Sequence, residues 1–238
     1  NESLGWYKND ISDFILRSAN DIGIDAFLHE VGPPEILQDE TFYKKMNQYS
    51  CVIFFARLGD QNRFENNGFS TKRVMSYVRD CESLASTFGT LDYNLNILIK
   101  DAIDRLIETS NKIEINCPLG TKLIGKISQD NCETKEVSVL RFPILVSKPI
   151  DAKPFSGKVV LNNYLTSTGS RVYTPNFLEI DNEVTITIDN GSITDVQGIP
   201  EDVKNFRKHY DYVSQKFGID MNSVHSWHPG IHPGTRDN

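Results

Sequence analysis

Apolar residues recur at helical spacing in two stretches of the first half of the chain. Residues 10–22 place apolar side chains on one face, and Gly23 is suited to end that helix. Residues 92–110 give the longest helical pattern, with Thr90 or Asp92 as the N-terminal cap. The apolar positions of this second helix are Leu95, Leu98, Ile99, Ala102, Ile103, Leu106 and Ile107.

Between these two helices the pattern changes back and forth between strand and helix. Residues 25–31 favour a short strand, and residues 34–49 favour a helix that Pro34 can open. The continuous apolar run 51–56 is typical of a strand covered on both faces, and residues 73–79 fit either a strand or a helix. The order helix, strand, helix, strand predicts an α/β segment with parallel strands over residues 1–110.

After Asn111 the pattern becomes one of short strands. Asn190-Gly191 stands between two alternating runs and predicts a two-residue hairpin. Residues 201–217 form one late amphipathic helix, which Gly218 ends. The expected strands are 112–116, 122–127, 136–146, 157–161, 171–173 and 183–188. We therefore predict an α/β fold in which the parallel-sheet segment is followed, over residues 111–238, by a β-rich, partly closed sheet with one late helix.

Composition places the chain among ordinary globular proteins. It has 238 residues, of which 39% are hydrophobic and 24% charged, with a formal net charge of -7. The acidic balance argues against nucleic acid as a partner, since phosphate contacts need a basic surface. No apolar run reaches the length of a membrane span, and no secretory signal pattern is present. We expect a protein without a membrane or nucleic-acid partner.

The four cysteines are scattered and contain no CxxC pair. Cys51 and Cys117 lie in apolar runs and are predicted to be buried thiols, which favours a reducing, cytoplasmic setting. Cys81 stands near the basic Arg79, so a thiolate nucleophile is an alternative to a plain thiol there. Gly120-Thr121 fits either a tight turn or an anion-binding turn.

Three of the five histidines fall within residues 224–235, called the histidine segment below. The segment also contains two Pro-Gly pairs, which forbid a regular helix there. His225, His228 and His232 are therefore expected on a turn-rich loop. Neutral imidazole is a common ligand for transition metals, and two histidines three residues apart on a loop could reach one ion. The alternative is a surface loop in which Trp227 and the prolines pack while the histidines are solvated.

Several short phrases of the sequence stand in an order that resembles a known family. They are Leu91-Asp-Tyr-Asn94, Cys117-Pro-Leu-Gly-Thr121, Phe142-Pro143 with Lys148-Pro149, Phe155-Ser-Gly-Lys-Val-Val160, Asn190-Gly-Ser-Ile-Thr-Asp-Val-Gln-Gly198 and Gly230-Ile-His-Pro233. This order is similar to the aminopeptidase T family of metallopeptidases and to its relatives, the 2,5-dihydroxypyridine dioxygenases. The resemblance covers most of the chain and also implies a homodimer formed through the β-rich half.

The chain departs from that family where the metal ligands are expected. The segment 143–149 matches an element that carries a metal-binding Glu in the peptidases, and it contains no carboxylate here. His225 and Trp227 loosely match a His and a Trp of the dioxygenases, and His232 stands where the family has Asn. The family's later His-x-Asp pair falls beyond Asn238. Either the natural protein is longer, or the chain is a shortened relative with a degenerate metal site.

Two functions follow from this resemblance, with no catalytic residue assigned. The favoured hypothesis is a non-catalytic accessory protein that binds a peptide or small molecule and needs no metal. The alternative is a metal-dependent enzyme, either an Fe(II) dioxygenase acting on a hydroxylated aromatic ring or a Zn(II) aminopeptidase. For either enzyme, the candidate metal ligands are His225, His228 and His232, and Trp227 is the candidate substrate-binding residue.

Overall fold

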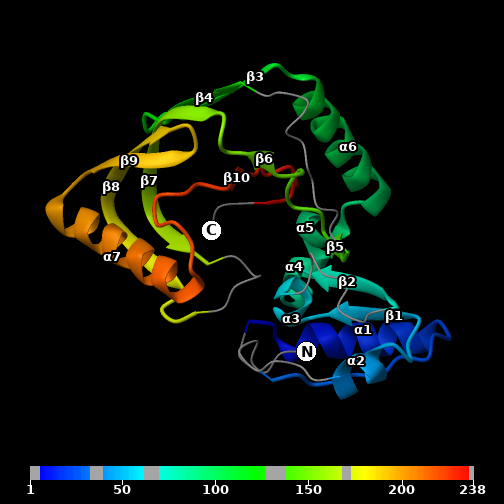
Figure 1. Ribbon diagram of the computed structural model, residues 1–238. Coiled ribbons are helices and arrows are strands. Elements are labelled where there is room, and N and C mark those ends of the chain that lie inside the picture. The colour runs from blue at the N-terminus through cyan, green and yellow to red at the C-terminus, as the bar shows by residue number, and fades with distance from the viewer. Residues whose placement is uncertain (1–5, 33–39, 62–69, 127–137, 168–172, 236–238) are drawn as a thin grey trace.

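Two sheets of different kind organise the protein (Figure 1). The computed structural model describes residues 6–32, 40–61, 70–126, 138–167 and 173–235. A parallel sheet has the strand order β1-β2-β5, and an antiparallel sheet has the order β3-β4-β7-β8-β9. The prediction of an α/β fold with a parallel-sheet segment, a β-rich segment and one late helix is confirmed, and the sheet of the β-rich segment is antiparallel and not closed.

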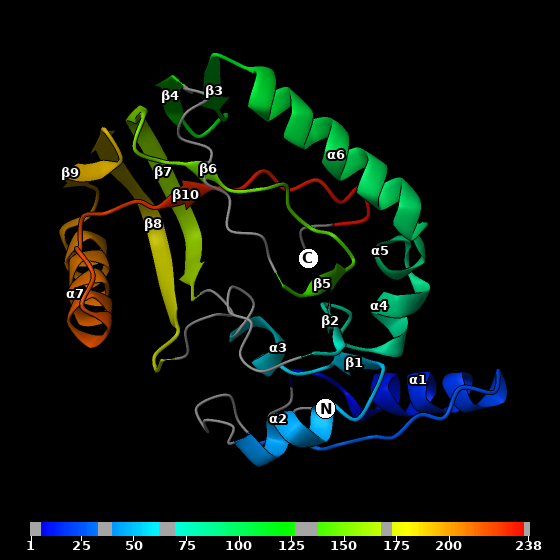
Figure 2. The same ribbon diagram turned by 45° about the vertical axis from the view of Figure 1, so that its right-hand side comes forward.

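The parallel sheet is built from β1 (Cys51–Phe54), β2 (Lys72–Ser76) and β5 (Leu140–Phe142). Helices α1 (Asn9–Asp21) and α2 (Glu40–Met46) lie on the side of this sheet away from the antiparallel sheet (Figures 1 and 2). The short helices α3 (Leu58–Gln61), α4 (Cys81–Ala85) and α5 (Thr87–Thr90) follow β1 and β2. Since β5 comes from beyond residue 111, the chain returns to its first sheet. The predicted domain boundary at residue 110 stays a prediction.

Three local predictions are wrong. Residues 25–30 form no strand, and Val31 makes only an isolated bridge. Cys51 is exposed because β1 lies at the edge of its sheet, and Cys117 is exposed because it begins the turn after β3. An apolar run predicts burial only where a neighbouring element covers it. Cys132, residues 34–39 and most of the predicted strand 171–173 lie outside the described residues.

The antiparallel sheet follows the predicted strands closely. It contains β3 (Lys112–Asn116), β4 (Lys122–Lys126), β7 (Phe155–Thr166), β8 (Phe177–Asp189) and β9 (Ser192–Gln197). The hairpin at Asn190-Gly191 is confirmed, with φ of 47° and 74° as a type I′ turn requires. The sheet is open, because its edge strands β3 and β9 do not pair. Helix α7 (Pro200–Phe217) packs against β8 through the buried Phe206, and Gly218 ends it with φ 63°.

Helix α6 (Tyr93–Thr109) forms where predicted, but it buries a different face. Asp92 caps it by accepting the Leu95 backbone N–H at 2.9 Å. Its buried positions include the polar Asn96 and Asp104, while Leu95, Leu98 and Leu106 are exposed. The polar face turns inward because the neighbouring segment 144–148 presents backbone groups that need hydrogen-bond partners. Among the described residues, no helix is long and apolar enough to cross a bilayer.

Candidate functional site

The first part of the histidine segment pairs along its backbone between the two halves of the protein. Strand β10 (Ser226–Trp227) pairs antiparallel with β6 (Ile150–Asp151), and the pairing continues from Ile231 N–H to Leu145 O at 2.9 Å. In Figure 2 this red segment crosses from β6 toward α5 and α6. The predicted turn-rich loop is backbone-paired over residues 225–231 and forms a turn at residues 233–234. It connects the antiparallel half to the α5–α6 region.

Trp227 belongs to the core of the antiparallel half. Its ring stands edge-on to that of the fully buried Phe155, with 6.1 Å between centroids. The indole N–H is buried and has no acceptor among the described residues. The side chain thus has a packing role in this structure, and substrate binding by Trp227 stays a prediction.

His225 and His228 flank the two-residue strand β10, one on each side. Both histidines are exposed, and His228 Nε2 lies 3.0 Å from the hydroxyl of Ser226. Neither belongs to a group of three possible metal ligands among the described residues.

His232 is buried, with 6% of its surface exposed. Gly234 donates its backbone N–H to His232 Nδ1 at 3.1 Å, and the imidazole lies against Phe88, with 5.2 Å between ring centroids. Since Nδ1 accepts, the neutral ring carries its proton on Nε2, which is buried without a partner among the described residues. Neither nitrogen then offers a lone pair to a metal ion.

These three histidines do not fit an Fe(II) or Zn(II) centre as they stand. No three His, Cys, Asp or Glu side chains gather into a possible metal site within the part of the chain that the structure describes. The ring nitrogens of His232 are occupied by a hydrogen bond and a proton, and His225 and His228 are exposed on either side of β10. The structure does not bring the predicted ligand set together, and metal binding by these residues stays a prediction.

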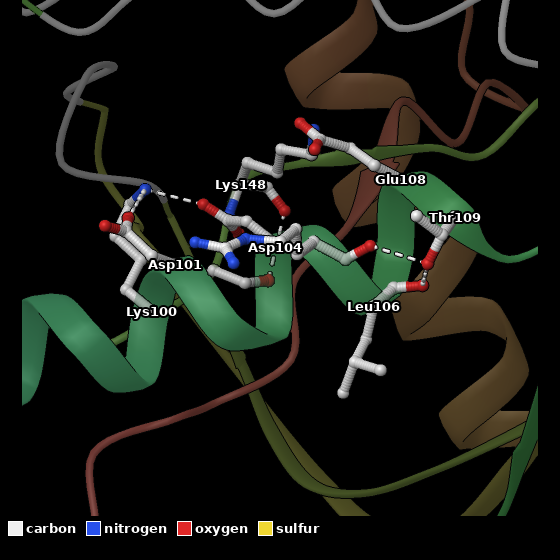
Figure 3. Close-up of polar contacts among 9 residues, drawn as sticks. Lys100, Asp101, Asp104, Leu106, Glu108, Thr109 and Lys148 are labelled. Carbon is white, nitrogen blue, oxygen red and sulfur yellow. Dashed lines mark hydrogen bonds and ion pairs between the residues drawn. The ribbon is translucent and has the colours of Figure 1, made fainter.

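The segment 143–149, which lacks the family's metal carboxylate, instead contacts two carboxylates of α6 (Figure 3). Asp104 accepts the Lys148 backbone N–H at 2.9 Å and the Lys100 ammonium at 2.6 Å. The Lys148 ammonium pairs with Glu108. Asp104 is thus engaged by a lysine and a backbone N–H, and Glu108 by a lysine. The sequence analysis missed these residues, although a carboxylate among the apolar positions of a helix was a usable signal.

Asn96 lies two turns before Asp104 on the same buried face of α6. Its side-chain oxygen accepts the Ile144 N–H at 2.7 Å, and its amide donates to the Ile144 carbonyl at 3.2 Å. Asn96 is 1% exposed, so water does not replace these bonds. Asn96 and Asp104 together position the 144–148 backbone, to which the histidine segment pairs.

Cys81 and Gly120-Thr121, the two remaining candidates from the sequence, have ordinary structural roles. Burial, and then the charge of Asp10, raise the pKa of the Cys81 thiol, which opposes a thiolate nucleophile. The Gly120 N–H donates to the Cys117 carbonyl at 3.1 Å with φ of +107° at Gly120, as in a tight turn. Neither residue adds a reactive group to the histidine segment.

The buried state of His232 predicts a loss of stability in acid. Burial lowers the pKa of His232 below 6.5, so as the pH falls through about 6.5 the unfolded chain takes up the proton first and stability declines. His232→Asn keeps an oxygen that can accept the Gly234 N–H but cannot titrate. In urea unfolding at about pH 7.5 and about pH 5.5, we expect a smaller loss in the variant. The pKa values of His29 and His209 are also lowered, but they are common to both proteins. An equal loss in both would contradict this role for His232.

Comparison with known proteins gives one likeness of fold. No protein-family model matches the chain, and no curated protein matches it. The solved structure of 2,5-dihydroxypyridine dioxygenase from Pseudomonas putida KT2440 is similar, with a TM-score of 0.58 and 12% sequence identity. The match covers 89% of this chain and 64% of that one. At this identity the likeness shows a shared fold. It supports the dioxygenase side of the resemblance, and no comparison supports the aminopeptidase T side.

Proposed function

We propose that this chain is a non-catalytic protein of dioxygenase-like fold that binds a small molecule or peptide. The observation that supports this best is the state of His232, whose Nδ1 accepts a backbone N–H while its Nε2 proton is buried. The lack of any group of three possible metal ligands among the described residues and the lysine-paired carboxylates of α6 point the same way. On this proposal the histidine segment stabilises the junction of the two halves. Small hydroxylated aromatic compounds are the first ligands to screen.

The alternative is a metal-dependent dioxygenase, which the likeness of fold favours. The chain spans 64% of the dioxygenase structure that it matches, so residues outside this chain could complete a site. His225 and His228 are exposed and would be its candidate Fe(II) ligands here. A Zn(II) aminopeptidase is the weaker alternative, since segment 143–149 offers no carboxylate. The homodimer implied by the resemblance is tested by the mass of the protein in solution.

Metal binding by the chain separates the two functions. Fe(II) and Zn(II) are titrated calorimetrically, without oxygen, into the wild type, into His225→Ala/His228→Ala and into the control His209→Ala on α7. The non-catalytic proposal expects no stoichiometric binding that depends on the first pair, and no consumption of 2,5-dihydroxypyridine after Fe(II) loading. About one equivalent of metal, lost in the double variant and kept in the control, would overturn the proposal in favour of the enzyme.

A further inference from the structure

Two arginines converge on one exposed tryptophan in the parallel half. The guanidinium carbon of Arg57 lies 4.8 Å from the centre of the Trp6 ring, and that of Arg79 lies 5.1 Å from it. Both distances are within the range of cation–π attraction, which holds a guanidinium against an indole despite the repulsion between the two cations. Two positive groups are thus kept close together on a protein with a net charge of -7.

The fold places these arginines at the edge of the sheet where α/β proteins bind ligands. Arg57 and Arg79 each follow the last residue of a strand by three positions, Phe54 in β1 and Ser76 in β2. Because β1 and β2 are adjacent and parallel, both arginines come from the same carboxyl-terminal edge. Ligands of open α/β sheets bind beyond this edge, where loops from neighbouring strands meet.

The backbone next to Trp6 is fixed at the same edge. Tyr7 is buried and donates its hydroxyl to the Ser76 carbonyl at 2.9 Å, and the Lys8 N–H donates to the Arg79 carbonyl at 2.9 Å. Trp6 itself is 37% exposed. The ring therefore has a defined position from which it can orient both guanidinium groups without being covered.

The nearby acidic groups leave Arg79 available to a ligand. Asp80 caps α4 by accepting the Ser83 N–H at 2.8 Å and pairs with Lys8 at 2.9 Å, and these contacts lower its pKa to about 2. Arg79 is exposed, and no acceptor among the described residues bonds its guanidinium. Stacking on an indole leaves the in-plane N–H groups of a guanidinium free, and that fork matches the two oxygens of a carboxylate or phosphate.

We propose that Arg79, oriented by Trp6 beside Arg57, binds a small anionic ligand through its phosphate or carboxylate group. The Arg79 guanidinium supplies a planar pair of N–H donors that matches two oxygens of such a group. The inference does not depend on whether the histidine segment binds a metal, because Trp6, Arg57 and Arg79 all belong to the parallel half.

The test is calorimetric titration of the whole chain at low ionic strength with pyrophosphate and, separately, with malonate. The wild type is expected to bind one of them saturably, and Arg79→Gln to lose at least about tenfold in affinity. Arg79→Lys keeps the charge but not the planar fork, so it is also expected to bind more weakly. Arg105→Gln, an exposed arginine of α6, is the matched control and should bind as the wild type does. Preference for pyrophosphate identifies a phosphate ligand, and preference for malonate a carboxylate ligand.

Three results would overturn the proposal. They are absence of saturable binding of either anion by the wild type, wild-type affinity in Arg79→Lys, and an equal loss in Arg105→Gln. The first would leave the arginines with a purely structural contact to Trp6, and the other two would indicate general attraction to positive charge. Arg79 is exposed, so its variants are expected to keep the wild-type thermal unfolding midpoint. A metal titration that favours the enzyme would leave this result unchanged.

Discussion

Replacing Trp227 with alanine is expected to lower the free energy of unfolding by about 3 kcal/mol. The substitution removes the ring that stands against Phe155, a residue with no exposed surface, and leaves a cavity beside the β6–β10 pairing. Because Trp227 is only partly buried, we expect the lower end of the cost of truncating an aromatic residue. Urea unfolding followed by far-UV circular dichroism measures the change.

Trp227→Phe is the matched control for this substitution. It keeps a ring against Phe155 and removes the indole N–H, which is buried without an acceptor among the described residues. The lost ring area and the removed unpaired donor oppose each other, so the variant should stay within about 1.5 kcal/mol of the wild type. If Trp227→Ala changed the free energy of unfolding by less than Trp227→Phe does, the indole would not anchor the histidine segment.

Replacing Asn96 with leucine is expected to cost about 2–5 kcal/mol of stability. Leucine has the same branched arrangement of side-chain heavy atoms, but it leaves the N–H and the carbonyl of Ile144 without their side-chain partner in a buried position. Each unsatisfied buried group costs about 1–3 kcal/mol. The loss should also loosen the 144–148 backbone, to which the histidine segment pairs through Leu145 and Ser147.

Asn94→Leu provides the comparison on the same helix. Asn94 is exposed, so its replacement should change the free energy of unfolding by no more than about 0.5 kcal/mol. Amide hydrogen exchange adds a local readout, because Asn96→Leu should speed exchange at Ile231, whose N–H bonds to Leu145. Equal stability of the two variants would show that Asn96 does not hold segment 144–148.

Features that depend on residues close together in the sequence were predicted well. The Asn190-Gly191 hairpin, the Asp92 cap of α6 and the end of α7 at Gly218 all form as expected. Each is governed by local backbone conformation: a turn needing positive φ, a carboxylate bonding a free N–H, a glycine in the left-handed region. The alternation of helix and strand also predicted the parallel segment, and the run of short strands after Asn111 predicted the β-rich segment.

Features that depend on distant partners were not predictable in this way. The exposure of Cys51 follows from the edge position of β1, and the inward turn of Asn96 follows from the needs of Ile144. The histidine segment is the clearest case. Its prolines and glycines predicted a turn-rich loop, yet residues 225–231 pair along the backbone with residues 145–152. That pairing joins segments far apart in the sequence, so the local pattern of prolines and glycines does not predict it.

The sequence by itself determined the class of fold, most helix and strand positions, and which residue types were available for chemistry. Only the tertiary structure decided which of them meet. In that structure His232 Nδ1 accepts a backbone N–H and Nε2 is buried. Arg57 and Arg79, from two separate loops, both contact Trp6. The physical reason is that local patterns carry backbone preference and amphipathicity, whereas proximity and burial depend on strand order and on long-range hydrogen bonds.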